Sequence, residues 1–346
     1  MSVVKVTWLD RQHAGDRDLA GAAAVAQAAR SVDCPYRAPW TVARFAGLFR
    51  HGWDGEPPDI AVARNEQGRV AGVLAAYLTH RDNRHLAVID IAVDPYLRRR
   101  GIGRLLFQAG VDHARDHGRT VLVVPLAGRP ENDAFAVSMD LHRAAEEVHR
   151  RQDLLALDWQ RLDAGYAAAL SYSAGYELIP IAGAVPADLV DDIAHLAAAI
   201  NDAPTGDLDI EDEAFTTERI RAFEAAMAAR HIRTYRLVAR DRKSGALAGH
   251  TVVGLDGEQP WYGDQFDTSV LREHRGHRLG LLLKIGMLRW LADAEPQLRV
   301  LDTSNMASNS HMIKVNGTLG YRVAGSTVDW QRRINAAGDD QRRPLT

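Results

Sequence analysis

Between a predicted strand and a predicted helix, the chain reads Val93-Asp94-Pro95-Tyr96-Leu97-Arg98-Arg99-Arg100-Gly101-Ile102-Gly103. The two glycines allow a tight turn and let an anion approach the backbone amides closely. The helix that begins here offers unpaired N–H groups and the positive end of its dipole, and the three arginines add full charges. The stretch therefore predicts a cradle for a diphosphate at a helix N-terminus. A surface turn with a solvated basic run is the alternative interpretation.

This loop resembles the signature of the GNAT acetyltransferase superfamily: Gln or Arg, two residues, Gly, one residue, then Gly or Ala, after a Val-x-Pro strand end. The matching residues are Val93, Pro95, Arg98, Gly101 and Gly103. The resemblance implies acetyl-CoA as cofactor, with its pyrophosphate on the loop amides and its pantetheine arm against the strand 89–93. The residues implied for CoA in this half are Ile91, Val93, Arg98, Arg99, Arg100, Gly101, Ile102 and Gly103.

A second loop with the same spacing follows in the other half: Val270-Leu271-Arg272-Glu273-His274-Arg275-Gly276-His277-Arg278-Leu279-Gly280. Arg275 and Gly280 match the first and last signature positions, whereas Arg278 takes the place of the middle glycine. A residue other than glycine fits there if its φ stays negative, and its guanidinium would bind phosphate directly. We expect Lys284, one turn into the helix, to help. The residues implied for CoA here are Thr268, Val270, Arg275, Gly276, His277, Arg278, Leu279 and Gly280.

The predicted elements repeat together with the loop. Each half reads as strand, two helices, hairpin, strand, loop, helix, strand, helix and strand. A period of about 175 residues indicates a duplicated domain, because solenoid repeats are much shorter. The expected fold class is mixed α/β (α+β), with two tandem GNAT domains as in two-domain proteins of the mycothiol-synthase type. We expect domains at 1–158 and 176–335, each closed by its own last strand, a helical linker at 159–175 and a tail at 336–346.

The composition agrees with two ordinary domains. The chain has 346 residues, of which 46% are apolar and 25% are charged. Its formal net charge of −3, with both signs mixed along the chain, argues against a nucleic-acid binder, which would need a basic face. The N-terminus lacks the pattern of a signal peptide, and no run is apolar enough to span a bilayer. Because Cys34 is the single cysteine, no internal disulfide can form, and we expect a cytoplasmic protein.

The second half carries an amide-rich stretch that resembles the acyl end of the family. The pattern Asn-x-x-(Ala/Met) followed by Leu-Gly-Tyr is matched from Asn309 and Met312 to Tyr321. The resemblance implies that Asn305 bonds the pantetheine amides and that Asn309 begins the helix, on which Met312 and Asn316 share one face. Asn316 takes the place of the tyrosine that often protonates the leaving thiolate in the family. A turn and a helix cap are the alternative roles of Asn305 and Asn309.

The corresponding stretch of the first half is poorer in polar groups. Ala136 takes the position of the family tyrosine, and the preceding strand ends in Val123-Val124-Pro125-Leu126, without an asparagine. The first half therefore has the more complete phosphate loop, and the second half has the more complete acyl end. We expect the chemistry in the second half, while the first half binds CoA without turnover or only supports the fold.

Carboxylates supply the candidates for acid–base work. Asp90 and Asp267 each lie three residues before the last valine of a predicted strand. Since a carboxylate on this strand often acts in GNAT enzymes as a base or holds a water, Asp267 and the nearby Asp264 join Asn316 as catalytic candidates. Solvent exposure or pairing with an arginine is their alternative role. The six carboxylates of residues 201–213 are expected to wall the acceptor site and attract a cationic amine, unless they form a solvated loop.

These features predict an acyltransferase: an acetyl-CoA-dependent N-acetyltransferase that acts on the amine of a small molecule and releases CoA. Direct attack is expected, because no activated nucleophile is evident to carry a covalent acyl group. No metal, membrane or nucleic-acid partner is expected, and the protein would be a monomer or a homodimer. Two other functions stay open: acetylation of a peptide N-terminus or lysine, and a non-catalytic module that binds or senses CoA. The missing tyrosine in both halves keeps the second of these open.

Overall fold

The computed structural model describes residues 4–334, and the chain divides into two compact units. The first unit comprises the residues up to Glu147, the segment Thr205–Asp212 and the residues from Gly325 onward. The second unit comprises Val148–Pro204 and Glu213–Ala324. Neither unit is a single continuous piece of the chain, so the fold depends on segments that cross from one unit to the other.

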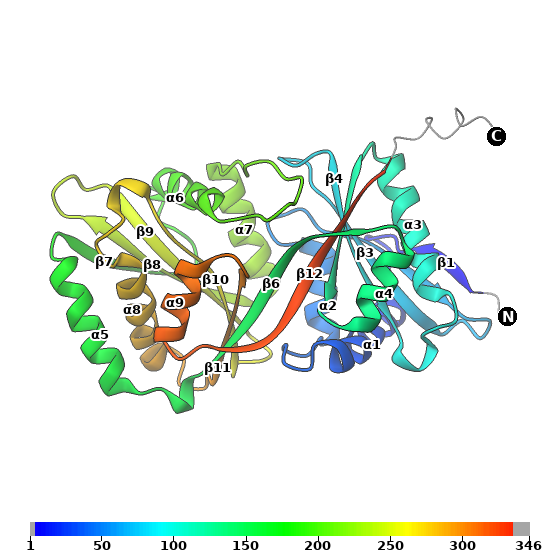
Figure 1. The fold of residues 1–346 in the computed structure, drawn as a ribbon, viewed down its shortest axis with the longest axis horizontal. Coiled ribbons are helices and arrows are strands. Elements are labelled where there is room, and N and C mark those ends of the chain that lie inside the picture. The colour runs from blue at the N-terminus through cyan, green and yellow to red at the C-terminus, as the bar shows by residue number, and fades with distance from the viewer. Residues whose placement is uncertain (1–3, 335–346) are drawn as a thin grey trace. The chain divides into compact units, whose positions relative to one another are not determined.

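The first unit is a mixed sheet with helices on both faces (Figure 1). Its strand order is β1 (Lys5–Trp8), β2 (Asp59–Arg64), β3 (Val70–Leu78), β4 (Leu86–Val93), β5 (Val121–Ala127) and β12 (Arg322–Arg333). The pairings are antiparallel except for β4 with β5, which is parallel. Its helices are α1 (Asp16–Asp33), α2 (Val42–His51), α3 (Ile102–Asp116) and α4 (Pro130–Ser138), with the short helix η1 (Pro95–Leu97) before α3.

The second unit repeats this architecture. Its strand order is β7 (Tyr176–Ala182), β8 (Ile232–Asp241), β9 (Leu247–Asp256), β10 (Tyr262–Val270), β11 (Val300–Met306) and β6 (His142–Asp153). The helices are α5 (Trp159–Tyr172), α6 (Val190–Ala197), α7 (Thr217–Ala229), α8 (Leu279–Ala294) and α9 (Ser310–Thr318), and the short helices are η2 (Leu154–Ala156), η3 (Ala198–Asp202) and η4 (Arg272–His274). The predicted order of elements is confirmed in both halves, and α5 lies where a helical connector was expected.

Local signals explain where several helices begin. The hydroxyl of Thr41 accepts a hydrogen bond from the amide of Arg44 at 3.0 Å, which confirms Thr41 as the cap of α2. Thr216 and Asp158 cap α7 and α5 in the same way. None of the helices within residues 4–334 is both long and apolar enough to cross a bilayer.

The expectation that each half closes its sheet with its own last strand is wrong. Thr327–Arg333 of β12 pairs antiparallel with β5 of the first unit, and β6 lies beside β11 in the second. Because β5 and β11 offer similar edges of unpaired backbone groups, the order of elements cannot tell which edge a strand joins. The compact units therefore depart from the expected ranges 1–158 and 176–335, and the expected tail at 336–346 lies outside the described residues.

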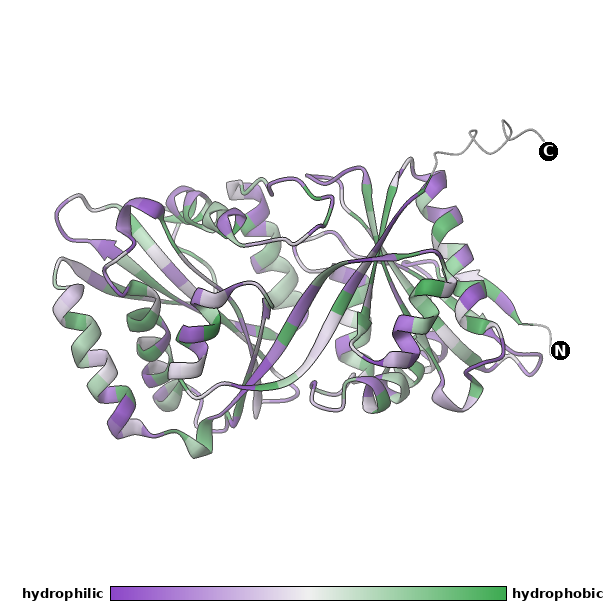
Figure 2. Cartoon of the chain, viewed as in Figure 1, coloured by the Kyte–Doolittle hydropathy of each residue, from purple (hydrophilic) through white to green (hydrophobic). Residues whose placement is uncertain are grey.

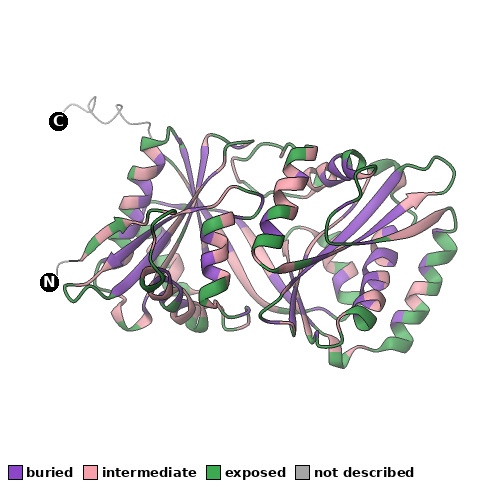
Figure 3. Ribbon diagram, turned by 180° about the vertical axis from the view of Figure 1, so that it is seen from behind, coloured by how far each residue is buried: buried purple, intermediate pink, exposed green. Residues whose placement is uncertain are grey.

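Apolar side chains cover both faces of each sheet. In the first unit, one cluster includes Leu106 of α3, and the cluster on the other side includes Leu19 of α1. In the second unit, one cluster includes Leu283 of α8, and the other includes Ile193 of α6. Helix α8 is hydrophobic along most of its length (Figure 2), whereas α5 is largely exposed and β8 and β9 are largely buried (Figure 3).

Candidate functional site

In each unit, two parallel strands separate before the loop that was predicted to bind phosphate begins. The pairing of β4 with β5 covers Leu86–Val88, but β4 continues to Val93 in its pairing with β3. Likewise, β10 pairs with β11 over Tyr262–Asp264 and continues to Val270 against β9. The separated stretch of each strand presents backbone groups to which an extended ligand with amides can add as a further strand. This geometry suits the pantetheine arm at the positions expected for it, Ile91 and Val93 in one unit and Thr268 and Val270 in the other.

The two loops share one backbone conformation with their glycines exchanged. Arg99 and Gly101 have φ of 63° and 84°, and the equivalent Gly276 and Arg278 have φ of 87° and 56°. Each loop thus has two left-handed positions, filled by one arginine and one glycine in opposite order. The expected negative φ at Arg278 is therefore wrong: Arg278 itself adopts the left-handed conformation at the start of α8.

The helix starts are open to a ligand. A Cβ added to Gly101 or Gly280 would meet no other heavy atom within 4 Å, so an anion could reach the amides there. Gly103 is tighter, because its added Cβ would lie 3.3 Å from the ring of Phe135. Ile102 and Leu279 turn buried side chains into the cores, so these two residues can offer a ligand only their amides.

Arg98 and Arg275 hold the loops to their own units. Nη1 and Nη2 of Arg98 donate to the two carboxylate oxygens of Asp33 at 2.9 and 2.6 Å, and its Nε lies 3.4 Å from the carbonyl of Val93. In the second unit, Arg275 donates to Asp202 at 2.5 Å and from Nε to the carbonyl of Val270 at 3.1 Å. These two guanidinium groups are therefore engaged within the protein, whereas Arg99 and Arg100 of the first loop lie at exposed positions beside the loop amides.

The second loop is also fastened to α5. The guanidinium of Arg278 lies 3.8 Å from the ring centroid of Tyr172, and the Ser173 hydroxyl donates to the carbonyl of His277 at 2.6 Å. Nδ1 of His274 lies 3.0 Å from the hydroxyl of Tyr176. The arginine expected to bind phosphate directly thus stacks on an aromatic ring, a contact for which the loop sequence carries no signal.

Lys284 does not extend the phosphate cradle. Its side chain is buried, with Nζ 5.2 Å from the ring centroid of Tyr321. Burial disfavours the charged amine and lowers the pKa of Lys284 to about 7. The expectation that Lys284 helps the loop is wrong, because the lysine occupies the inward face of α8 rather than its exposed first turn.

A β-bulge shapes β10 in the second unit. The register between β10 and β9 shifts between Gln265 and Thr268. The side chain of Gln265 fills the gap, donating to the carbonyl of Val252 at 2.7 Å and to the hydroxyl of Thr251 at 3.0 Å. Bulges re-aim side chains beside active sites, and this one includes the predicted catalytic residue Asp267.

Asp267 lies at the end of a buried charged row that the sequence did not reveal. Nη1 of Arg236 on β8 lies 2.6 Å from Nδ1 of His250 on β9, and Nε2 of His250 lies 2.6 Å from Oδ2 of Asp267. Burial by itself raises the pKa of Asp267, but His250 and Arg236 outweigh it and lower that pKa to about 2. Asp267 is therefore a carboxylate at neutral pH. A histidine in the middle of the largely apolar strand β9 was the one available signal.

Asp264 belongs to a different polar cluster. Its carboxylate accepts a hydrogen bond from the hydroxyl of Tyr262 at 2.7 Å. The neighbouring Asp302 on β11 accepts two hydrogen bonds from Arg151, at 2.7 and 2.8 Å. Pairing of Asp264 with Asp302 in register places both carboxylates at the point where the two strands separate.

The acyl end of the second unit contains two linked asparagines. Nδ2 of the fully buried Asn316 donates to Oδ1 of Asn305 at 2.7 Å. Oδ1 of Asn316 is buried and has no hydrogen-bond partner among residues 4–334. Asn309 caps α9 by accepting from the amide of Met312 at 3.1 Å, so the alternative role as a cap is confirmed. The free acceptor on Asn316 suits an N–H donor from a ligand.

The first unit is apolar at the equivalent positions. The amides of Leu141 and Tyr321 donate to the carbonyls of Ala136 and Asn316, respectively, which makes these two residues equivalent. By strand register, Leu126 stands for Asn305, Val73 for His250 and Ile60 for Arg236. The equivalent carboxylate, Asp90, lies at an exposed position near the charges of Arg30 and Arg37.

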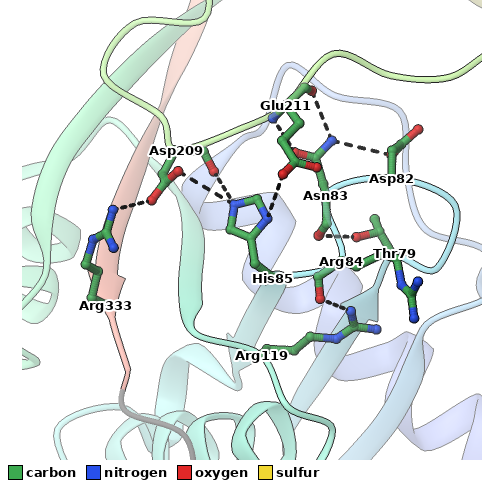
Figure 4. Close-up of polar contacts among 9 residues, drawn as sticks. All are labelled: Thr79, Asp82, Asn83, Arg84, His85, Arg119, Asp209, Glu211 and Arg333. Atoms are coloured by element: carbon green, nitrogen blue, oxygen red, sulfur yellow. Dashed lines mark hydrogen bonds and ion pairs between the residues drawn. The ribbon is translucent and has the colours of Figure 1, made fainter.

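The acidic run at 201–213 is largely taken up by contacts of the chain with itself. Residues Thr205–Asp212 pack in the first unit, where Asp209 and Glu211 lie beside His85 and Asn83 at the start of β4 (Figure 4). Three of the six carboxylates are paired with arginines: Asp202 with Arg275, Asp209 with Arg333 and Glu213 with Arg219. Residues 205–212 of the run therefore belong to the first unit, whereas Asp202 and Glu213 pair with arginines of the second.

Comparisons with known proteins agree with this architecture. Residues 25–135 match the model of the acetyltransferase (GNAT) family. A solved tandem GNAT protein from the clavulanic acid biosynthesis pathway is 29% identical, with 96% of this chain and 98% of that chain covered and a TM-score of 0.77. A GCN5-related N-acetyltransferase from Sphaerobacter thermophilus is 15% identical, with 96% of each chain covered and a TM-score of 0.67, which shows the fold alone. A comparison with curated proteins finds no match.

Proposed function

The chain is an acyltransferase of the GNAT family with a tandem GNAT arrangement, and on this premise we propose that it acetylates the amine of a small molecule by direct attack on acetyl-CoA. The reaction is assigned to the second unit. Acetyl-CoA supplies the activated thioester. We propose a cytoplasmic monomer or homodimer, in keeping with a single cysteine and a modest net charge.

Different residues of the second unit are assigned to different parts of acetyl-CoA. The amides from Gly276 to Gly280 are assigned to the pyrophosphate, and the free edge of β10 from Thr268 to Val270 is assigned to the pantetheine arm. Asn316, held by Asn305, is assigned to the acyl end, where its unpaired oxygen would accept a hydrogen bond from an N–H group of the pantetheine arm. An amide is a poor acid, so Asn316 positions the thioester and does not protonate the thiolate.

One observation supports the assignment of the reaction to the second unit most strongly. Asn305, Asn316 and the row that ends at Asp267 are polar groups in a mostly buried setting, and burying such groups costs free energy unless they are used or satisfied. The first unit has Leu126, Ala136, Val73 and Ile60 at the equivalent positions, so it retains the loop without the polar acyl end. We infer that the first unit binds CoA without turnover or supports the fold.

The test is a turnover assay over a panel of small amines. It compares the native protein with variants that place a negative charge in one loop or the other. Gly280→Asp is expected to raise the KM for acetyl-CoA by about tenfold or more, because an anion at the helix start repels the pyrophosphate. Gly280→Asn carries no charge and serves as its control. Gly101→Asp and Gly101→Asn form the matched pair in the first unit, where activity is expected to persist.

The outcomes separate the candidate functions. Loss of activity only with Gly101→Asp would overturn the assignment to the second unit. Tight CoA binding without turnover of any amine or peptide would indicate a sensing module instead. Turnover of peptides but of no small amine would indicate a peptide acetyltransferase.

A further inference from the structure

Three adjacent strands of the second unit carry Arg236, His250 and Asp267 in a row. Arg236 and His250 are buried, with 7% and 0% of their surfaces exposed. The side chain of Asp267 is 27% exposed, so the row leads from the interior to a carboxylate that solvent reaches. Val238, which follows Arg236 on the same face of β8, packs in the cluster that includes Ile193 of α6, so the row lies on the side of the sheet covered by that helix.

The contacts fix the tautomer of His250. A guanidinium can only donate, so Nδ1 of His250 accepts from Arg236 and the ring proton sits on Nε2. That nitrogen is the one 2.6 Å from Oδ2 of Asp267. The imidazole thus lies between a buried cation and a carboxylate, and the charge of Arg236 favours the ionised form of Asp267.

A carboxylate held in this way is a weak base. General bases work best when their pKa lies near the working pH, and that of Asp267 is lowered to about 2. A fixed negative charge would also keep an adjacent amine protonated and hence unable to attack. The carboxylate therefore suits a cationic group that stays charged throughout the reaction.

We propose that Asp267, positioned by His250 and Arg236, binds a second basic group of the acceptor, so that the substrates are small molecules with one amine to acetylate and another cationic centre. This inference rests on the proposed function and names the substrate class of that same site. His250 and Arg236 are positioning residues, since they act through Asp267. The first unit, with Val73 and Ile60 at the equivalent positions, has no such row.

The experiment compares putrescine with its amino-alcohol analogue, in which a hydroxyl replaces one amine. The native protein is expected to show a KM about tenfold lower for putrescine. Asp267→Asn is expected to raise that KM about tenfold while the KM for the amino alcohol and both kcat values stay within about twofold. His250→Val reproduces the residue of the first unit and should likewise raise the KM for putrescine. His250→Gln can both accept and donate a hydrogen bond and should keep the preference for putrescine over the amino alcohol. Asp90→Asn is the matched control and should change neither KM.

The possible results distinguish failure of this inference from failure of the proposed function. Equal KM values for both amines in the native protein would overturn the inference and leave the proposed function standing. A fall in kcat for both amines with Asp267→Asn would make Asp267 a base and would also overturn it. Absence of turnover with every amine would overturn the proposed function, and the inference with it. CoA affinity and thermal unfolding of each variant show whether it is folded, and Asp267→Asn, at a partly exposed position, keeps the test valid if His250→Val does not fold.

Discussion

Arg98 donates from both terminal nitrogens to the carboxylate of Asp33 at the end of α1. Arg275 repeats the arrangement with Asp202, at the end of the short helix that follows α6. In both loops the arginine also reaches back to the carbonyl of a valine five residues earlier. The first signature residue of each loop therefore fixes the backbone that forms the cradle, and its own charge is largely neutralised.

Removal of this contact should destabilise the first unit. Arg98→Ala is expected to lower the free energy of unfolding by about 1–3 kcal/mol, since it removes charged hydrogen bonds from a partly buried carboxylate. Denaturant unfolding measures the change. Arg100→Ala, at an exposed position, is the control and should alter stability by less than about 0.5 kcal/mol. Equal losses in the two variants would contradict a structural role for Arg98.

Two glycines of the second loop should respond oppositely to alanine. Gly276 has a φ of 87°, so Gly276→Ala is expected to cost about 1–2 kcal/mol of stability. Gly280 lies in the first turn of α8 with open space at its Cβ, so Gly280→Ala should cause no loss. Thermal unfolding of both variants provides the comparison. Similar losses for both would show that backbone conformation is not what requires glycine here.

Asn316 offers a test of the acyl end. Asn316→Ala reproduces the residue of the first unit and removes both the bond to Asn305 and the unpaired buried oxygen. We expect kcat to fall about tenfold, equal to about 1.4 kcal/mol, while the affinity for CoA changes little. Steady-state kinetics with a fixed amine, and calorimetry with CoA, separate the two effects. An unchanged kcat would remove Asn316 from the catalytic assignment.

Lys284 should make stability depend on pH. The pKa of Lys284 is about 7 in the folded protein, whereas an unperturbed lysine, as in the unfolded chain, has a pKa of 10.5. Between these two values the unfolded chain binds more protons than the folded protein, so the free energy of unfolding rises with pH. Lys284→Met is expected to stabilise the protein by a few kcal/mol at pH 7 and to flatten the rise in stability between pH 7 and 10.5. Chemical unfolding at several pH values follows both slopes. A parallel slope in the variant would mean that Lys284 is not the group responsible.

Much of the fold and part of the site follow from short stretches of sequence. The element order, the cap at Thr41 and the placement of two loops between strand and helix depend on neighbours along the chain, and they agree with the structure. The correspondence of Ala136 with Asn316 also follows from spacing alone. These features could be predicted because helix starts, turns and strand ends are set by local backbone chemistry.

Other features depend on residues far apart in the sequence. His250 and Arg236 meet Asp267 only because β8, β9 and β10 pair in one register, and Arg278 takes a left-handed φ while it stacks on Tyr172 of α5. Whether Lys284 faces the core or the loop depends likewise on how α8 packs against its unit.

The sequence by itself predicted two loops for phosphate in two repeated halves, one with the complete glycine pattern and the other with the fuller acyl end. Only the tertiary structure decided that the last strand of each half completes the other half's sheet, and that Asp267 is held as a carboxylate by a buried histidine and arginine. The physical reason is that loop chemistry is encoded by adjacent residues. Strand exchange and charge pairing, in contrast, depend on which edges and side chains meet after the chain has folded.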